Sequence, residues 1–428
     1  MSTNNYHYLV NKEINILGFL ILISFLIRIP IIILYGDTSL EYEWKPLVYN
    51  LVENKQLVYQ SFDDFLLPNL WMPPLYAYYL YFFSFFNLDE LNYIKLILYS
   101  QVLLASISIA VFYKINNFFF SKKISLYSSL FFSFFPLHAY ACSQVSSISL
   151  QIFLTILFFY FFFRFLEKKN ILSIILFSLS SGLLILLRGE FWAIFILSLF
   201  YLLFLLKVQL KQILLIFLIT LITASPYLIR NFVIFEKITV LQSFGYNLWK
   251  GNHPQAMKDS RVEGTDYSSF HADNTNVSLL PFEKDIKEKI DLIPIDKFYR
   301  INTDKIFLDE AIKNIKSEPI NHLIFIGKKI VSFLFINIQS MDPRYWNPLH
   351  YLPVLMIGIT SLIGIGLSDK KSYKFNYLIL IFLINVMIFS AVSILPRYKL
   401  IILPLQIIFT NVLIDKIIKK FFLEKQNN

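Results

Sequence analysis

Long apolar runs separated by short polar segments make up most of this chain of 428 residues. A helix that crosses the hydrocarbon core of a bilayer needs about twenty mostly apolar residues. Runs of about that length lie at 14–34, 94–113, 124–141, 148–165, 171–187, 191–206, 210–229, 349–367, 375–395 and 399–415. The pattern therefore predicts an all-α polytopic membrane protein with a bundle of about ten transmembrane helices.

Two longer polar segments interrupt the runs and divide the chain into three predicted parts. The first part, 1–229, is a membrane domain that includes a long loop at 35–93. An extracytoplasmic or interfacial region at 230–348 follows, and 349–428 holds the last membrane helices and a basic tail. The apolar stretch from Leu75 to Phe86 is too short to span, and that from His322 to Ile338 carries two central lysines. We expect the former to be interfacial or re-entrant and the latter to be an amphipathic interfacial helix.

The distribution of lysine and arginine gives the orientation. Cytoplasmic loops of membrane proteins are enriched in these residues. Basic residues cluster in alternate loops and in the tail, at 114–123, 164–169, 207–211, 370–374 and 416–425. The run at 14–34 lacks a small-residue cleavage site, so we interpret it as a retained span. The sequence thus predicts an integral, multi-pass membrane protein with both termini cytoplasmic and both polar segments extracytoplasmic.

Composition excludes other classes of protein. Hydrophobic residues make up 56% of the chain and charged residues only 16%, far from the composition of a soluble domain. The net charge of +10 does not indicate nucleic-acid binding, because the cations lie between apolar runs. The single Cys142 cannot form an intrachain disulfide, and the histidines show no metal-ligand spacing. No cofactor is therefore assigned. Asp63 and Asp64 are the nearest candidates for a divalent metal site, with a solvated acidic loop as the alternative.

The first outer loop begins with two candidate catalytic carboxylates. Asp37 follows a glycine directly after the first span, and Glu41 comes four residues later. A carboxylate held at the membrane surface is suited to deprotonating a hydroxyl that meets a lipid-linked substrate. An acidic surface loop without catalytic function is the alternative. Farther along the loop, the Trp-Met-Pro-Pro-Leu-Tyr string that ends at Tyr76 is typical of an interfacial anchor.

Cations at the predicted outer face oppose the usual charge bias and so indicate anion binding. They are Arg188, which is followed closely by Glu190, and Arg230, Arg397 and Lys399. Arginine binds phosphate through two parallel hydrogen bonds. Headgroup anchoring and structural ion pairing are the alternatives. After Arg230 come Asn231 and a Gly-rich segment that we expect to be a turn with exposed amides and rings, suited to sugar hydroxyls and phosphates; it contains Asn247, Trp249, Lys250 and Asn252.

Taken in order, these strings resemble bacterial glycosyltransferase family 39. The order is a carboxylate after the first span, Pro-Pro-Leu-Tyr, Leu-Arg-x-Glu, Pro-aromatic-x-x-Arg-Asn, Asn-Leu-Trp-x-Gly-Asn and Arg-Tyr-x-Leu, from about Arg28 to Pro404. This is the protein O-mannosyltransferase and aminoarabinose-transferase-like branch of the C-type superfamily. The resemblance implies a GT-C-like bundle with a long first outer loop and a small outer-face region between the seventh and eighth spans.

The resemblance also implies a function. It is transfer of a sugar from a polyprenyl-phosphate donor to a protein, lipid or polysaccharide acceptor at the extracytoplasmic face, with inversion at the anomeric carbon. Matched positions are Asp37, Arg230, Asn231, Asn247, Trp249, Gly251, Asn252 and Arg397. Two departures exist: Gly189 stands where members often have proline, and Tyr42 follows Asp37 by five residues and not four. The second departure leaves open whether Asp37 or Glu41 is the working carboxylate.

Chemically, a fixed cation must meet the charge that develops on the departing lipid phosphate, and a carboxylate must stand across the pocket. Arg397 and Asp37 form such a pair if the first loop packs against the last two helices. The alternatives are another polyprenyl-linked glycan enzyme, such as an O-antigen ligase or polymerase, a transporter or flippase of lipid-linked sugars, and an inactive structural subunit. Few ionisable residues inside the spans, and no visible internal repeat, disfavour the transporter.

Overall fold

A computed structural model describes residues 3–40, 43–62, 65–262, 281–338, 340 and 346–427. Each predicted apolar run coincides with helix: α1 (Thr3–Tyr35), α4 (Glu90–Asn116), α5 (Lys122–Phe134) with α6 (Pro136–Ala141), α7 (Ile148–Lys168), α8 (Ile171–Leu187), α9 (Phe191–Phe200) with the π-helix η1 (Tyr201–Leu205), α10 (Leu210–Phe235), α16 (Pro348–Leu367), α17 (Tyr373–Ala391) and α18 (Lys399–Asn427). The predicted all-α membrane fold is therefore confirmed.

Seven of the described helices are individually long and apolar enough to cross a membrane, and α8 and α9 with η1 form two shorter apolar segments. The chain is a multi-pass membrane protein. The run at 124–141, predicted as one span, is divided by Pro136 into α5 and α6. Proline lacks an N–H and disfavours helical backbone in the residue before it, and Phe135 is accordingly extended.

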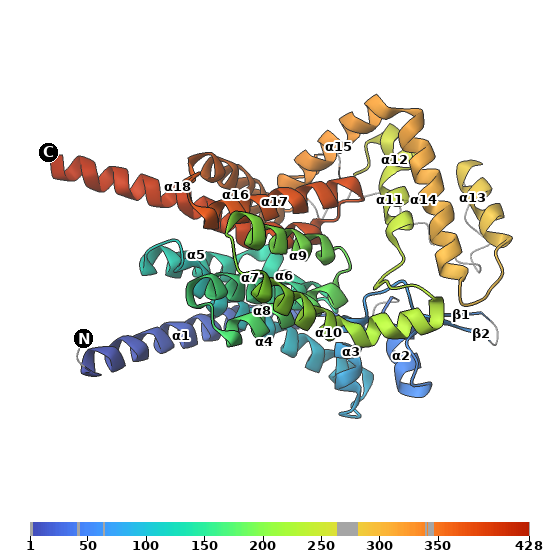
Figure 1. Cartoon of the computed structure of the whole chain (residues 1–428), viewed down its shortest axis with the longest axis horizontal. Helices are drawn as coiled ribbons and strands as arrows, with labels where there is room; N and C mark the ends of the chain where they lie inside the picture. The colour runs from blue at the N-terminus through green and yellow to red at the C-terminus, as the bar shows by residue number, and fades with distance from the viewer. Residues whose placement is uncertain are drawn as a thin grey trace.

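The remaining elements gather at one end of the bundle (Figure 1). They include α2 (Lys45–Glu53), the antiparallel hairpin of β1 (Val58–Phe62) and β2 (Phe65–Pro68), α11 (Phe244–Asn252), α12 (Pro254–Asp259), α13 (Pro281–Asp291) and α14 (Tyr299–Ser317). Both termini lie at the opposite end. This arrangement has the two polar segments on one side and the termini on the other, as the charge pattern predicts. The hairpin was not predicted.

Two short helices connect this end to the bundle. The stretch predicted to be interfacial or re-entrant forms α3 (Pro74–Ser84), and the predicted amphipathic segment forms α15 (Pro319–Leu334), which packs along α17. One face of α15 exposes Ile320, Leu323 and Ile324, whereas Phe325 and Lys329 are buried. This two-sidedness agrees with the amphipathic prediction, while its position at a membrane interface stays a prediction.

Close helix packing fixes the bundle around α8. A Cβ added at Gly182 would lie 2.5 Å from Thr223 Cβ on α10, so only glycine permits this approach. Thr220 donates a hydrogen bond from Oγ1 to the Ser178 carbonyl oxygen at 3.2 Å. Small residues and hydroxyl bonds of this kind are how helices associate in lipid. The end of α8, where Arg188 begins the next turn, is thereby held firmly against α10.

Candidate functional site

Asp37 is bonded to the segment that precedes α7. Its N–H donates to the Ser143 carbonyl oxygen at 3.0 Å, and its Oδ2 accepts the Val145 N–H at 2.6 Å. The amide of Gln144 donates back to the Tyr35 carbonyl oxygen at 3.1 Å, at the end of α1. These bonds hold the half-exposed carboxylate of Asp37 just before the first turn of α7.

The surroundings of Asp37 suit a base. Partial burial raises the pKa of its carboxyl above the ordinary value, and the bond from the Val145 N–H opposes this shift without cancelling it. A carboxylate with a raised pKa takes a proton more readily near neutral pH. The other candidate, Glu41, lies outside the described residues, as do Asp63 and Asp64.

Tyr76 contacts the same segment through Gln101. It is fully buried, and its O–H donates to Gln101 Oε1 at 2.8 Å. The amide of Gln101 in turn donates to the Gln144 carbonyl oxygen at 2.9 Å. The sequence analysis predicts that the string ending at Tyr76 is an interfacial anchor. In the structure the buried Tyr76 contacts, through Gln101, the loop that holds Asp37.

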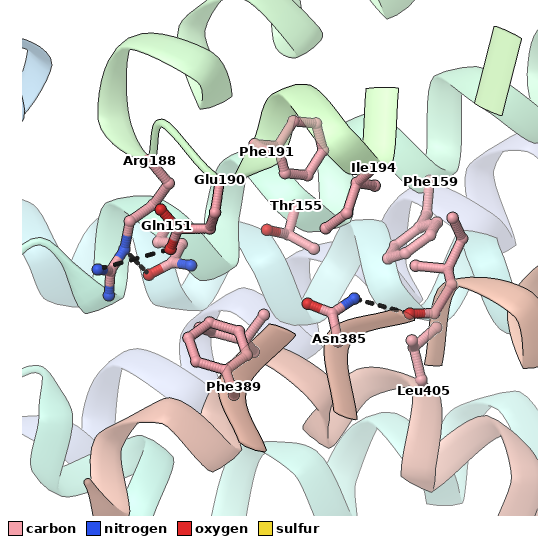
Figure 2. A pocket seen from close by; sticks show the side chains of 12 residues that line it. Gln151, Thr155, Phe159, Arg188, Glu190, Phe191, Ile194, Asn385, Phe389 and Leu405 are labelled. Atoms are coloured by element: carbon pink, nitrogen blue, oxygen red, sulfur yellow. Dashed lines mark hydrogen bonds and ion pairs between the residues drawn. The ribbon is translucent and has the colours of Figure 1, made fainter. Parts of the chain in front are cut away.

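A pocket lies between α7, the α8–α9 turn, α9, α17 and α18 (Figure 2). It is partly open to the surface. Its lining is Gln151, Thr155, Phe159, Arg188, Glu190, Phe191, Ile194, Ile381, Asn385, Phe389, Ile401 and Leu405. Gln151, Thr155 and Phe159 follow one another on one face of α7, so the pocket extends inward from the helix start.

Arg188 is the cation of this pocket. Its Nε donates to Gln151 Oε1 at 2.9 Å, and one terminal nitrogen lies 3.8 Å from Glu190 Oε1. The guanidinium carbon is 5.7 Å from the centre of the Tyr398 ring. Figure 2 shows the guanidinium at one edge of the lining residues, beside Gln151 and Glu190. The site therefore holds an oriented cation, a carboxylate and amides within apolar walls.

Arg397 and Lys399 flank Tyr398 but face different surroundings. The side chain of Arg397 is exposed in the short helix η4 (Pro396–Tyr398), and within the described ranges it makes no hydrogen bond or ion pair. Lys399 is buried and donates from Nζ to the Phe335 carbonyl oxygen at 2.6 Å. The contact between Tyr398 and Arg188 brings the neighbourhood of Arg397 to the pocket, whereas Lys399 bonds to the end of α15.

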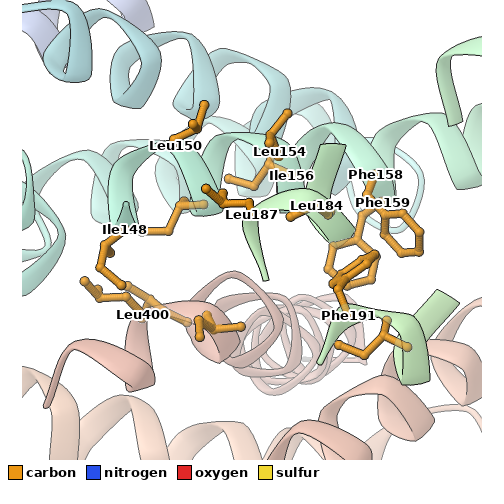
Figure 3. Close-up of a cluster of buried hydrophobic side chains, with 14 of the residues drawn as sticks. Ile148, Leu150, Leu154, Ile156, Phe158, Phe159, Leu184, Leu187, Phe191 and Leu400 are labelled. Carbon is orange, nitrogen blue, oxygen red and sulfur yellow. The ribbon is translucent and has the colours of Figure 1, made fainter. Parts of the chain in front are cut away.

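The wall behind the pocket is a dense apolar cluster. Leu184, Leu187, Phe158 and Phe191 interdigitate between α7 and α9, with Leu400 of α18 and Ile148 closing one side (Figure 3). All six side chains are buried. Such packing excludes water and lowers the local dielectric constant, which strengthens any electrostatic contact made by Arg188.

Arg230 and Asn231, predicted near a helix end, lie inside α10, which continues to Phe235. The guanidinium of Arg230 donates to the carbonyl oxygens of Asn69 at 2.8 Å and Leu57 at 3.3 Å. Its NH1 also donates to Asn231 Oδ1 at 2.7 Å, and Asn231 Nδ2 donates to the Thr239 carbonyl oxygen. These bonds dock the first loop onto α10.

The predicted sugar-contacting turn is a helix, α11, and this is a correction. Its side chains bond inward: Asn247 Nδ2 donates to the Ser243 carbonyl oxygen at 2.7 Å, and Trp249 is fully buried against Phe307 and Ile286. Lys250 is buried as well. Asn252 donates to the Ala391 carbonyl oxygen at 2.8 Å and accepts from Lys329. The two glycines of this segment allow close approach of other backbones and do not form an exposed turn.

Amide side chains inside apolar runs were the signal that the sequence analysis missed. Gln101, Gln151 and Asn385 all lie in predicted spans, and each is buried. A polar group in a membrane helix is costly unless it has a partner or a role, which is the reasoning applied above only to ionisable residues. Among the residues with described side chains, no group of three or more histidine, cysteine, aspartate or glutamate residues could hold a metal ion.

No family model matches the sequence, and no curated protein matches it. Among solved structures, two crystal structures of the Archaeoglobus fulgidus oligosaccharyltransferase are similar, each with a TM-score of 0.53. One is the apo form and the other is tethered with an acceptor peptide containing the NVT sequon via a disulfide bond, at 13% and 11% identity. The fold of this chain is similar to the membrane fold of these two structures. The matches cover 97% of this chain but 51% of the archaeal chain, so this chain spans about half of that protein's length.

Proposed function

We propose that the protein is an inverting glycosyltransferase. It moves a sugar from a polyprenyl-phosphate donor to a protein, lipid or polysaccharide acceptor at the extracytoplasmic face of a bacterial plasma membrane, in the manner of family 39. The observation that supports this most directly is the pocket at the start of α7, where Arg188 and Glu190 lie among apolar residues and Arg188 contacts Tyr398, the neighbour of the exposed Arg397 in the sequence. The likeness of fold to an oligosaccharyltransferase supports the same class of chemistry.

In this mechanism the lipid phosphate of the donor binds Arg188 and Arg397. The acceptor hydroxyl oxygen attacks the anomeric carbon from the opposite face and forms the new glycosidic bond. The bond between the anomeric carbon and the phosphate oxygen breaks, and its electron pair stays on the lipid phosphate. The proton of the hydroxyl passes to the carboxylate of Asp37. The guanidinium groups stabilise the charge that develops on the leaving oxygen.

Glu190 and Gln151 orient the cation in this scheme. Glu190 Oε1 lies 3.8 Å from a terminal nitrogen of Arg188, and Gln151 Oε1 accepts a hydrogen bond from Arg188 Nε at 2.9 Å. A positioned arginine reaches the transition state without the cost of reorganising its side chain. Asp37 is connected to the same helix start through Ser143 and Val145. Asp37 is thus bonded to the segment that precedes α7, and Arg188 is bonded to Gln151 in the first turns of α7, so contacts with the same end of one helix position both groups.

Binding of undecaprenyl phosphate to the purified full-length protein in detergent tests this function without knowledge of the sugar. We expect saturable binding that Arg188→Ala and Arg397→Ala both weaken. Lys123→Ala, an exposed cation at the end of the bundle that bears the termini, is the matched control and should bind as wild type does. Mass spectrometry of surface glycans with and without the protein then identifies the transferred sugar. Absence of any binding by the wild-type protein would refute the proposal.

The side of the membrane is tested separately. In a Cys142→Ser background, a cysteine at the exposed Leu292 should react with an impermeant thiol reagent from outside the cell. A cysteine at Lys371, in the loop between α16 and α17, should react only after the cytoplasmic face is opened. Labelling of both from the same side contradicts the proposed orientation.

A further inference from the structure

The connection between α17 and α18, residues 392–398, carries Arg397 and is tied at both ends to α15. At one end, Asn252 donates to the Ala391 carbonyl oxygen at 2.8 Å, and Lys329 of α15 donates to Asn252 Oδ1 at 2.9 Å. At the other end, Lys399 donates to the Phe335 carbonyl oxygen, directly after α15. In addition, the Ile394 N–H donates to the Val262 carbonyl oxygen at 2.8 Å.

The end of α11 presses directly on this connection. A Cβ added at Gly251 would lie 2.5 Å from both the Ser393 nitrogen and the Val392 carbonyl carbon. Only a glycine permits that approach, so the backbone at 392–393 has no room to move toward α11. The bond from Asn252 to the Ala391 carbonyl oxygen therefore acts at the start of a segment that is already confined by packing.

Lys329 is an unusual component of this junction. Its side chain is completely buried, with Nζ 4.7 Å from the centre of the Phe325 ring and bonded to an amide. Burying an ammonium group is costly, because the group leaves its hydration shell. The cost appears in the pKa of Lys329, which burial lowers to about 7. A leucine or methionine would pack here at no such cost, but it could not hold Asn252.

We propose that Lys329 is a positioning residue for the lipid-phosphate donor. Through Asn252 it fixes the connection 392–398 and thereby the position of Arg397, whose neighbour Tyr398 contacts Arg188 of the pocket. The inference rests on the proposed function for its ligand, but the positioning itself is a property of the fold. Lys329 touches no substrate in this scheme, and its effect on binding passes through Arg397.

The first experiment measures how firmly Arg397 is held, without any ligand. A spin label at position 397, in a Cys142→Ser background, reports the mobility of the connection. Lys329→Met should increase that mobility, because methionine keeps the volume and loses the bond to Asn252. Lys328→Met is the matched control, since Lys328 donates to Ser260 Oγ at 2.7 Å and has no described contact with Asn252. Unchanged mobility in Lys329→Met overturns the proposal whatever the protein binds.

The second experiment is a double-mutant cycle on undecaprenyl phosphate binding by the full-length protein. Lys329→Met alone should weaken binding by about tenfold to a hundredfold, the range expected for a misplaced binding group. In an Arg397→Ala background the same substitution should have almost no further effect, because both changes remove one interaction. Additive losses overturn the positioning role. If the wild-type protein does not bind undecaprenyl phosphate but Lys329→Met still increases the mobility at position 397, the proposed function is refuted. The positioning of the connection by Lys329 is then not refuted.

Discussion

Two regions at the same end of the molecule use charged side chains in opposite ways. In α10 and the region that follows it, two of the cations are directed into protein: Arg230 bonds two backbone carbonyls, and Lys329 bonds Asn252. At the rim of the bundle, Arg188 and Glu190 line a pocket and Arg397 is exposed. Cations that looked alike as candidates in the sequence therefore differ in what they contact in the structure. Cations bonded to the backbone build the scaffold, and those facing a cavity are left for a ligand.

Arg300 illustrates the first region. It is buried, bonds Gln60 Oε1 of the hairpin, and places its guanidinium carbon 5.0 Å from the Trp71 ring. Rings on three sides and one amide anchor α14 to β1, because an arginine can stack on aromatic faces while donating in its plane. This cation joins the two polar segments of the chain and contacts no cavity described above.

The largest expected effect compares two aspartates, one from each region. Asp37→Asn should lower turnover by about a hundredfold or more, because the amide keeps the shape but cannot accept the acceptor proton. The protein should still accumulate and bind undecaprenyl phosphate. Activity is measured as sugar transfer to surface glycans, or to the acceptor that mass spectrometry of those glycans identifies. If Asp37→Asn turns over at the wild-type rate, Asp37 is not the catalytic base, and Glu41 is the remaining candidate.

The matched variant is Asp304→Asn. The carboxylate of Asp304 accepts from the Tyr246 N–H and from Gln242 Nε2, both at 2.9 Å, so an amide must lose one of these bonds. We expect poor accumulation and near-normal specific activity in the protein that survives, the reverse of the pattern at Asp37. The same loss of turnover in both variants would erase the distinction between the two regions.

The next effect separates two arginines. Arg188→Ala should weaken undecaprenyl phosphate binding by about tenfold to a hundredfold, the value of a hydrogen bond to a charged group, with little change in melting temperature. Arg230→Ala should lower the melting temperature in detergent, because the carbonyls of Asn69 and Leu57 lose their donor. Titration calorimetry and thermal unfolding give the two readouts. If Arg230→Ala loses binding while remaining as stable as wild type, Arg230 belongs to the site.

These contrasts mark what the sequence could predict. Apolar runs define the helices, because their lengths follow from the bilayer as a solvent, and the loop charges predict a common side for the two polar segments, which do lie at one end of the bundle. Whether Arg230 or Arg188 faces a cavity depends on contacts across more than a hundred residues, such as Arg230 with Asn69 and Leu57. Local pattern carries no information about such contacts. The glycines near Trp249 were ambiguous for the same reason, since close approach and tight turns both select glycine.

A smaller effect tests the support beneath Asp37. Tyr76→Phe removes the O–H that donates to Gln101 Oε1 but keeps the ring, which packs against Trp44 with centroids 4.7 Å apart. We expect a few-fold lower turnover with donor binding unchanged, because Gln101 can still reach the Gln144 carbonyl oxygen. Steady-state kinetics measures the effect, and Tyr99→Phe, on the exposed face of α4, is the control. Weaker donor binding in Tyr76→Phe would place Tyr76 in the site itself.

The smallest effect concerns pH and the buried Lys329. Its pKa in the folded protein is about 7, whereas an unfolded lysine titrates near about 10.4. Between these values the unfolded chain binds a proton that the folded chain does not, so the stability of the wild-type protein should rise as pH increases from 7 to 9. Lys329→Met removes this term, and the difference in melting temperature between wild type and variant should change by roughly 5 °C over that range. The histidines near Lys329 do not interfere: burial lowers the pKa of His253 to about 4 and lowers that of His322, so both titrate below this window.

Lys328→Met is measured alongside and should follow the wild-type protein. A parallel pH dependence in wild type and Lys329→Met would mean that Lys329 titrates as an ordinary surface lysine, and the cost assigned to holding Asn252 would be wrong.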